Sequence, residues 1–207
     1  MILFLGDSTN PLMSWLARHK SVQSMTDTLT ELPKGTETIV SYGYRHKVPA
    51  SILKQCRAIN LHIGYLPWNR GADPNFWSFI EGTPKGVTIH EMDERIDTGQ
   101  ILAQATITFR ERETLSSSYA ELHRLIQDLF TQAWWGIIAG HIIPCPQPRY
   151  GTYHRSRDKD QLFAKLCTKG WDTPVSVLEE YAEYTAEKQM SQQFWEKYES
   201  ELGKGKS

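Results

Sequence analysis

Short apolar runs alternate with helix-forming segments over the first half of the chain, and this alternation restricts the possible folds more than any other feature. The predicted strands are Ile2–Leu5, Glu37–Tyr42, Ala58–Ile63, Gly86–Met92 and Ile101–Phe109. The predicted helices begin at Asn10-Pro11, span Pro49–Cys56, and run from Asp73-Pro74 through Ile80. Asparagine or aspartate followed by proline is a common way to begin a helix. The pattern predicts an α/β fold with a mostly parallel, twisted sheet flanked by helices.

The clearest helical pattern covers Leu115–Ile138, where apolar residues recur at spacings of three and four and Gly140 follows as a stop signal. A rigid connection with three closely spaced prolines comes next. Beyond it, a polar helical tail is predicted from Thr173 to about Leu202. We therefore predict a catalytic core at residues 1–143 and a C-terminal extension with a helical tail at residues 144–207.

Composition excludes several classes of function. The formal net charge is −1 and no basic stripe is present, so we expect no nucleic-acid partner and no attraction to an anionic membrane. No run approaches the roughly 18 apolar residues of a membrane-spanning helix. The three widely spaced cysteines, Cys56, Cys145 and Cys167, form no disulfide framework, which favours a reducing cytoplasm.

Two polar residues interrupt the predicted strand Ala58–Ile63. Asn60 and His62 lie two residues apart, so they share one face of the strand near its C-terminal end, where open α/β sheets bind ligands. The loop Asp93–Gln100 supplies a carboxylate, Asp97. If the Asp97 carboxylate lies beside His62, it would orient the imidazole ring and raise the pKa of His62, while the Asn60 amide would donate to a developing oxyanion. Such a set suits acyl transfer to an amine.

Two extended motifs in the same order resemble the folate-dependent formyltransferases. Asn60-Leu61-His62 followed by Leu66-Pro67-Trp68-Asn69-Arg70-Gly71 and Pro74 is similar to the family pattern Asn-x-His, Leu-Pro-x-x-Arg-Gly and proline. Gly86-Val87-Thr88-Ile89 followed by Asp93-Glu94-Arg95-Ile96-Asp97-Thr98-Gly99 resembles its second block. The family includes glycinamide ribonucleotide transformylase, methionyl-tRNA formyltransferase, sugar N-formyltransferases and the formylation domain of gramicidin synthetase.

The resemblance implies a Rossmann-like formyltransferase fold, N10-formyltetrahydrofolate as formyl donor, and Asn60, His62 and Asp97 as the catalytic set. It also implies that folate is bound largely by backbone groups of two segments. The implied cofactor-binding residues are Gly43, Tyr44, Arg45, His46, Lys47, Asp93, Glu94 and Ile96. In two respects the chain departs from the family. Ile63-Gly64-Tyr65 stands where Pro-Ser-Leu is usual, and the short N-terminal region is expected to lack much of the early βαβ unit.

The rest of the chain is used to predict the amine that accepts the formyl group. Gly151-Thr152-Tyr153-His154 and Asp158 resemble the tail of sugar N-formyltransferases and of the gramicidin-type domain. The aromatic residues Tyr65, Trp68, Trp77 and Tyr153 either stack on a nucleotide base or pack at the rim. Arg70 is equally suited to a substrate phosphate or a surface salt bridge.

We expect the acceptor to be the amine of a dTDP- or GDP-linked amino sugar, for a cell-surface polysaccharide such as O-antigen. The alternatives are a carrier-bound aminoacyl group or another small amine, and a folate- or nucleotide-binding module without catalysis.

Three further patterns have competing interpretations. His90-Glu91-Met92-Asp93-Glu94 contains metal-binding residue types, but His90 and Glu91 point to opposite faces of a strand, so no metal is expected. Phe4-Leu5-Gly6-Asp7-Ser8 matches the start of GDS-type esterases, with Ser8 as nucleophile, but no aspartate is followed three residues later by histidine. A βα loop capped by Asn10 is expected instead. Aromatic residues of the tail either pack on the core or form a homodimer seam; they are Tyr181, Tyr184, Phe194, Trp195 and Tyr198.

Overall fold

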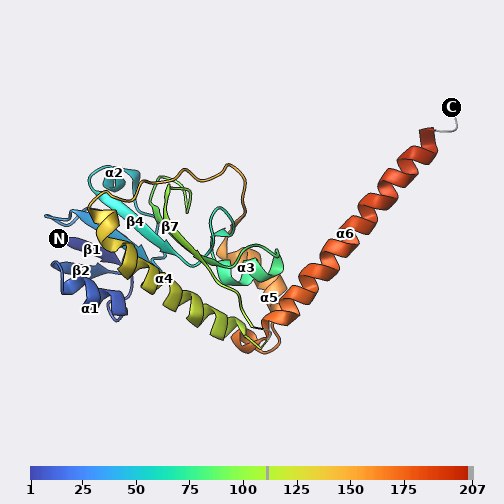
Figure 1. Cartoon of the computed structure of the whole chain (residues 1–207), viewed down its shortest axis with the longest axis horizontal. Helices are drawn as coiled ribbons and strands as arrows, with labels where there is room; N and C mark the ends of the chain where they lie inside the picture. Colours follow the sequence, from blue (N-terminus) through green and yellow to red (C-terminus); the bar gives the residue numbers. More distant parts are fainter. Residues whose placement is uncertain (111, 205–207) are drawn as a thin grey trace.

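The computed structural model describes residues 1–110 and 112–204. Its centre is a six-stranded sheet with the order β2-β1-β3-β4-β6-β7 (Figure 1). The strands are β1 (Ile2–Leu5), β2 (Val22–Met25), β3 (Thr38–Tyr42), β4 (Arg57–His62), β6 (Gly86–Glu91) and β7 (Ile101–Thr106). The helices are α1 (Pro11–Ala17), α2 (Ala50–Leu53), α3 (Pro74–Ile80), α4 (Leu115–Ile138), α5 (Asp160–Leu166) and α6 (Val175–Lys204). Two short strands, β5 (Arg70–Gly71) and β8 (Tyr153–His154), pair separately.

The sheet is parallel in one half only. Strands β2, β1, β3 and β4 are mutually parallel, whereas β6 runs antiparallel to both of its neighbours. Because His62 at the end of β4 pairs with Thr88 near the start of β6, the chain turns back at that end without crossing the sheet. The prediction of a mostly parallel sheet therefore holds for β1 to β4, and the mixed part brings a second polar strand beside β4.

The N-terminal βαβ unit is complete, contrary to the expectation that much of it is missing. Strand β1, helix α1 and strand β2 follow each other within the first 25 residues, and β2 pairs parallel to β1. Strand β2 is a half-exposed edge strand with a glutamine and a serine in its four residues, so it lacks the apolar run by which buried strands are found. The predicted cap is confirmed, because the Asn10 side chain accepts a hydrogen bond from the Leu12 N–H.

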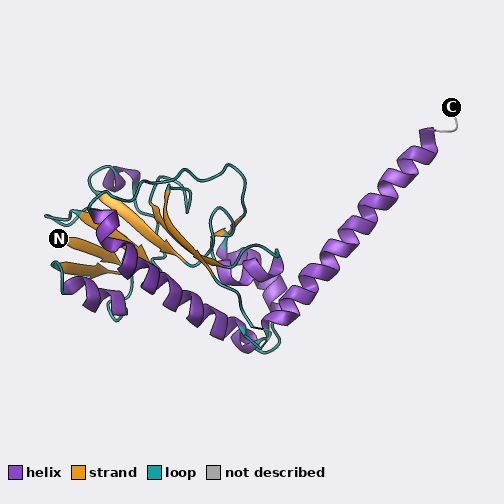
Figure 2. Cartoon of the chain, in the orientation of Figure 1, coloured by secondary structure: helices purple, strands orange, loops and turns teal. Residues whose placement is uncertain are grey.

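The two faces of the sheet bury different clusters. On one face, Ile2 and Phe4 of β1 pack with α1 and with the apolar stripe of α4. On the other face, Leu3 and Leu5 pack with α2. Figure 2 shows α4 running along the sheet as a single long helix. Ile59 and Leu61 of β4 belong to the α4 face, so Asn60 and His62 lie on the opposite face.

A third cluster joins α3 to the C-terminal part of the chain. Phe76 and Phe79 of α3 are fully buried against Leu115 of α4 and against Val175 and Leu178 of α6. Beyond this contact α6 extends away from the rest of the molecule (Figure 1). The prediction that Phe194, Trp195 and Tyr198 pack on the core or form a seam concerns side chains that the structure does not describe. Within the described part of the chain, no helix is both long and apolar enough to cross a membrane.

The start of α3 differs from its prediction. Asp73 occupies the cap position, but its backbone is left-handed (φ 53°) and its side chain makes no capping hydrogen bond. The carboxylate instead lies 2.7 Å from the ammonium group of Lys159, which precedes α5. The connection of residues 144–152, called the connector below, returns along the sheet, where Cys145 exchanges two backbone hydrogen bonds with Ile101. The predicted boundary between residues 143 and 144 stays a prediction.

Candidate active site

The polar face of two adjacent strands forms the floor of the site. In the antiparallel pairing of β4 with β6, Asn60 is directly opposite His90, and His62 is opposite Thr88. Side chains directly opposite each other in such a pair share a face of the sheet. This face, away from α4, is apolar under β1 and β3 and becomes polar at β4 and β6.

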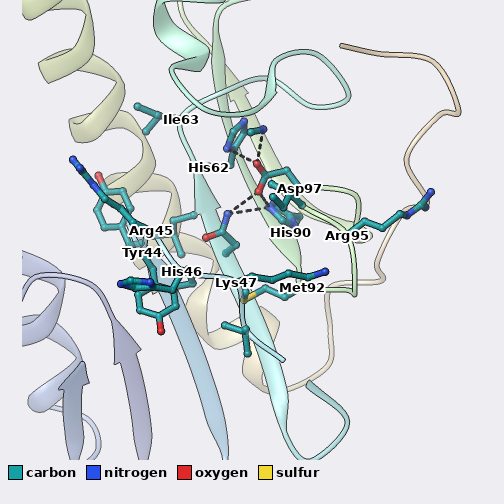
Figure 3. Close-up of a pocket in the computed structure, with 18 of the residues that line it drawn as sticks. Tyr44, Arg45, His46, Lys47, His62, Ile63, His90, Met92, Arg95 and Asp97 are labelled. Atoms are coloured by element: carbon teal, nitrogen blue, oxygen red, sulfur yellow. Dashed lines mark hydrogen bonds and ion pairs between the residues drawn. The ribbon is translucent and has the colours of Figure 1, made fainter. Parts of the chain in front are cut away.

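A cavity of about 300 Å³ opens above these residues at the C-terminal ends of β3 and β4. Figure 3 shows the segment after β3 on one side and the Asp93–Asp97 loop on the other. The predicted folate-binding residues that line the cavity are Gly43, Tyr44, Arg45, His46, Lys47, Asp93 and Ile96. Glu94 is not among them; it is exposed and lies 3.8 Å from the Lys54 ammonium group. A folate contact by Glu94 stays a prediction that its placement does not support.

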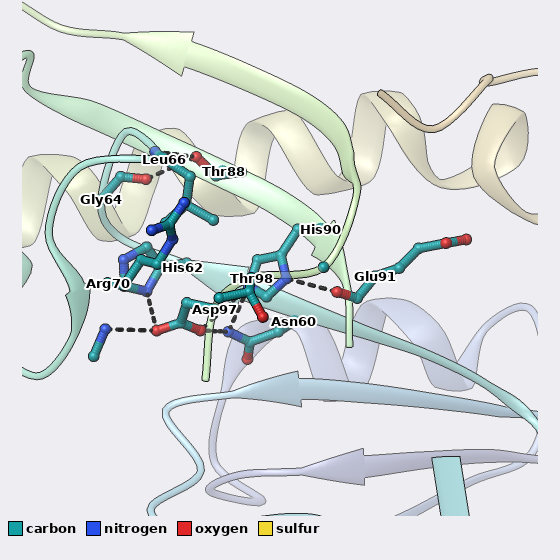
Figure 4. A network of polar contacts seen from close by, with 12 residues as sticks. Asn60, His62, Gly64, Leu66, Arg70, Thr88, His90, Glu91, Asp97 and Thr98 are labelled. Carbon is teal, nitrogen blue, oxygen red and sulfur yellow. Dashed lines mark hydrogen bonds and ion pairs between the residues drawn. The ribbon is translucent and has the colours of Figure 1, made fainter. Parts of the chain in front are cut away.

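Asp97 is the central acceptor of the network (Figure 4). The Asn60 amide donates to its Oδ1 at 3.1 Å, and the Gly71 N–H donates to its Oδ2 at 2.8 Å. The residue is 9% exposed and its backbone is left-handed, with φ 54°. Burial by itself would raise the pKa of this carboxyl, but neighbouring His62, the contact with His90 and the Gly71 N–H together hold that pKa well below its usual value. Asp97 is therefore a carboxylate at neutral pH.

His62 is 6% exposed and both of its ring nitrogens face oxygen atoms. Nε2 lies 3.0 Å from the backbone carbonyl of Asn69, and Nδ1 lies 3.4 Å from Asp97 Oδ2. The carbonyl and the carboxylate both only accept hydrogen bonds, so they compete for the single proton of the neutral ring. The shorter contact, to Asn69, favours the proton on Nε2 and the lone pair on Nδ1. Burial lowers the pKa of His62 by more than Asp97, as predicted, raises it, so this pKa lies below its ordinary value. The neutral ring is the form that can accept a proton.

His90 is a site residue that the sequence interpretation missed. The His90 side chain is 2% exposed, its Nδ1–H donates to the carbonyl of Glu91 at 2.7 Å, and its Nε2 lies 3.2 Å from the Asn60 amide nitrogen. Asn60 therefore directs one N–H to His90 and the other to Asp97, which fixes the orientation of the amide. The signal available in the sequence was the alternation of β6, but an antiparallel register was needed to bring His90 opposite Asn60.

The turn after β4 is tied to β6 by Thr88. Its hydroxyl donates to the Gly64 carbonyl at 2.8 Å and accepts from the Leu66 N–H at 3.1 Å. Gly64 lies so close to the imidazole of His62 that a Cβ at this position would come within 2.6 Å of Nε2. The departure from Pro-Ser-Leu to Ile63-Gly64-Tyr65 thus lies directly against the histidine.

None of the predicted substrate-binding residues lines the cavity. Arg70 is half-buried and donates twice to the Gln147 side-chain oxygen, at 3.1 and 2.9 Å, and among the described residues it forms no salt bridge. Trp77 is 6% exposed and stacks on His154 with ring centroids 3.9 Å apart, which weighs against stacking on a base. Trp68 packs against Tyr150. These substrate contacts stay predictions.

Tyr153 is exposed and Tyr65 half-buried, so both remain open to a ligand larger than the cavity. Over the described ranges, no group of three or more histidine, cysteine and acidic side chains is arranged to hold a metal ion.

Comparisons with known proteins relate most of the chain to one family. A family model described as formyl transferase matches residues 9–134, more than half of the chain. In the solved structure of the formyltransferase PseJ from Anoxybacillus kamchatkensis, in complex with UDP-4,6-dideoxy-4-formamido-L-AltNAc and tetrahydrofolate, the matched chain is 43% identical. That match covers 87% of this chain and 98% of PseJ, with a TM-score of 0.83.

Two other relatives match the core. A dTDP-4-amino-4,6-dideoxyglucose formyltransferase of Mycobacterium tuberculosis is 28% identical over 138 residues, which is 67% of this chain and 59% of the relative. A methionyl-tRNA formyltransferase of Enterococcus faecalis is 36% identical over 114 residues, which is 54% of this chain and 36% of that enzyme. The chain therefore spans well under two thirds of the length of these two relatives. With its mixed sheet and the family match across its core, the chain belongs to the formyl transferase family.

Proposed function

We propose that this protein transfers the formyl group of N10-formyltetrahydrofolate to the primary amine of a nucleotide-linked amino sugar. The observation that carries the proposal is the convergence of Asn60, His62 and Asp97 at the floor of one cavity, with the Asn60 amide and the His62 ring both against the same carboxylate. An amide donor, a neutral imidazole and a carboxylate are the groups that acyl transfer to an amine needs.

The chemistry follows from the geometry of these three side chains. The acceptor nitrogen attacks the formyl carbon, and the Asn60 amide donates to the oxygen that becomes negative, in place of its bond to His90. His62 Nδ1 takes the proton that the amine loses, and Asp97 stabilises the resulting imidazolium. The carbon–N10 bond then breaks and the proton passes to N10 of the departing tetrahydrofolate.

Two comparisons support a nucleotide sugar as acceptor. PseJ, which matches this chain over nearly its whole length, holds a UDP-linked 4-formamido sugar in its complex. The mycobacterial relative is named for a dTDP-linked 4-amino sugar. We therefore add a UDP-linked 4-amino sugar to the predicted dTDP- and GDP-linked candidates. A role in a cell-surface polysaccharide such as O-antigen remains part of the proposal.

The test is formyl transfer from N10-formyltetrahydrofolate to a panel of UDP-, dTDP- and GDP-linked 4-amino sugars, with the formamide product measured by mass spectrometry. Turnover of a nucleotide sugar, and none of the free sugar, is the expected result. Turnover only of a carrier-bound aminoacyl group or another small amine would reject the sugar as acceptor. Folate binding in a calorimetric titration, with no turnover of any amine, would favour a non-catalytic binding module.

The similarity to methionyl-tRNA formyltransferase offers a second acceptor, and the composition weighs against it. Binding the phosphate backbone of tRNA requires many lysines and arginines, and the formal net charge of this chain is −1. Formylation of methionyl-tRNA in the same assay would overturn this interpretation.

A further inference from the structure

The connector, residues 144–152, contacts both loops beside His62: the loop that carries Asp97 and the loop after β4 that carries Asn69. Its Gln147 side chain lies beside the Asp97 loop, and its Thr152 side chain lies beside the loop after β4. Its Gly151 approaches Pro67 so closely that a Cβ would come within 2.1 Å of the Pro67 carbonyl oxygen.

Gln147 fixes the backbone that carries Asp97. Its amide nitrogen donates to the carbonyl oxygens of Asp97 at 3.0 Å and Gly99 at 2.7 Å, while its side-chain oxygen accepts from Arg70. The left-handed backbone of Asp97 is unfavourable for most side chains, although aspartate tolerates it better than most. The two hydrogen bonds from Gln147 hold the loop in this conformation and so aim the carboxylate at His62.

Thr152 fixes the backbone that carries the Asn69 carbonyl. Its hydroxyl accepts from the Asn69 N–H at 2.9 Å and donates to Glu81 Oε2 at 2.8 Å. Asn69 is fully buried and also left-handed, with φ 55°, and its amide donates to Thr83 at 2.7 Å. The carbonyl of this residue is the group that faces His62 Nε2 at 3.0 Å.

We propose that the connector is a positioning element for the His62–Asp97 pair, in which Thr152 sets the tautomer of His62 through Asn69 and Gln147 sets the position of Asp97. The inference rests on the proposed function for its effect on catalysis, but the effect of the connector on the His62 ring does not depend on which amine is formylated. Two hydrogen-bond acceptors compete for the one proton of the neutral ring. The Asn69 carbonyl favours it on Nε2, and the Asp97 carboxylate favours it on Nδ1.

The first test compares Thr152→Val with Thr152→Ser. Valine has the shape of threonine but cannot bind Asn69 or Glu81, whereas serine retains the hydroxyl. Nitrogen-15 NMR of the imidazole rings reports the tautomer of each histidine. The signals of His62 are assigned as those that disappear in His62→Asn. We expect Thr152→Val to shift the His62 proton from Nε2 toward Nδ1 and to lower kcat about tenfold, with little change of KM for folate. Thr152→Ser should keep the wild-type tautomer and the wild-type kcat. Thr131→Val, at a half-buried position of α4 remote from the connector, is the matched control, because the Thr131 hydroxyl also donates a hydrogen bond, here to a backbone carbonyl.

The second test uses Gln147→Met, which keeps a side chain of similar length and removes the amide. Because Asp97 is then free to move from Nδ1, we expect His62 to keep its Nε2 proton while its pKa falls further and kcat decreases. Should Thr152→Val fail to fold, this variant tests the same inference. An unchanged His62 tautomer and kcat in Thr152→Val, or an unchanged His62 pKa and kcat in Gln147→Met, would overturn it.

The two proposals fail in distinguishable ways. If the tautomer shifts but the wild-type protein formylates no nucleotide sugar, the proposed function is wrong and the positioning role stands. If the wild-type protein turns over and Thr152→Val behaves like Thr131→Val in NMR and kinetics, the positioning role is wrong and the function stands.

Discussion

The two sides of the site are held by different kinds of structure. Asn60 and His62 lie on a central strand, where the register with β3 and β6 fixes their position. Asp97 lies on a loop with a left-handed backbone and is held by separate hydrogen bonds from Asn60, Gly71 and Gln147. The strand side is therefore fixed by the sheet, and the loop side depends on individual contacts from distant parts of the chain.

The largest effects are expected from removing one reacting group on each side. His62→Asn on the strand and Asp97→Asn on the loop should each lower kcat about 10²–10⁴-fold, the usual contribution of a general acid or base. Asparagine tolerates a left-handed backbone and can still accept from the Gly71 N–H, so Asp97→Asn should leave the loop and the folate affinity nearly unchanged. Steady-state kinetics and a folate titration measure the two quantities. Loss of folate binding in step with activity would show that these residues are structural.

A smaller effect, confined to the loop side, is expected from Gly71→Ala. Gly71 has φ 87°, donates to Asp97, and a Cβ there would come within 2.2 Å of the His154 carbonyl oxygen. We expect kcat/KM to fall at least about tenfold, the loss that follows from ~1.4 kcal/mol of transition-state stabilisation.

The matched control for this substitution is Gly82→Ala, because Gly82 also has a positive φ (60°) but open space around its Cβ position. Both variants place alanine at a positive φ, so the difference in kcat/KM reports what is specific to Gly71, namely the clash with His154 and the resulting displacement of the N–H that binds Asp97. Equal losses in the two variants would show that backbone strain alone is responsible.

The pH dependence distinguishes the roles of the two sides. If the neutral His62 ring accepts the proton, as proposed, activity should fall as pH drops through the His62 pKa, which lies below its ordinary value of 6.5. The acidic half-point of a kcat–pH profile should therefore lie below pH 6.5. Stability should decrease in the same direction, since unfolded His62 binds a proton at higher pH than folded His62 does. An acidic half-point above 6.5 would contradict the assignment of His62 as the base.

In Asp97→Asn, loss of the carboxylate removes the interaction that raises the His62 pKa, so that pKa should fall further. Proton-detected NMR titration of the His62 ring measures this without turnover. The depressed pKa of Asp97 also stabilises the folded state at neutral pH, and this contribution should disappear as pH falls from about 4 through the folded value.

The smallest effect is expected from truncation after Met190 in α6. The contacts of α6 with α3 involve its first turns, where Val175 and Leu178 are buried, and the distal part extends away from the core. We expect kcat/KM and the thermal midpoint to change little. Light scattering of both forms tests the predicted homodimer seam. A loss of activity together with a change from dimer to monomer would show that this part of α6 serves assembly.

The strand side of the site could be predicted from local sequence, and much of the loop side could not. The spacing of Asn60 and His62 shows that they share a face, and the Asp97 motif places a carboxylate in a neighbouring loop. By contrast, the placement of His90 depends on the reversal of β6, and the proposed roles of Gln147 and Thr152 depend on a connector that returns along the edge strand β7. The direction of the His62 pKa shift depends on burial, which the motif does not report.

The same division applies to the fold. The apolar runs and the stripe of α4 identify the buried elements, and the edge strand β2 is missed because half of its residues are polar. The prediction of a mostly parallel sheet holds for β1 to β4, and it did not identify β6 as antiparallel because alternation of strands and helices does not state whether a connection crosses the sheet.

The resting partners of the Asn60 amide have a consequence for the end of the reaction cycle. In the proposed reaction, the oxygen of the flat formamide product carries only a fraction of the negative charge that would draw the Asn60 amide away from its contact with His90. Asn60 can then return to His90 and Asp97, so the product loses a hydrogen bond once it is made, which favours its release over its retention.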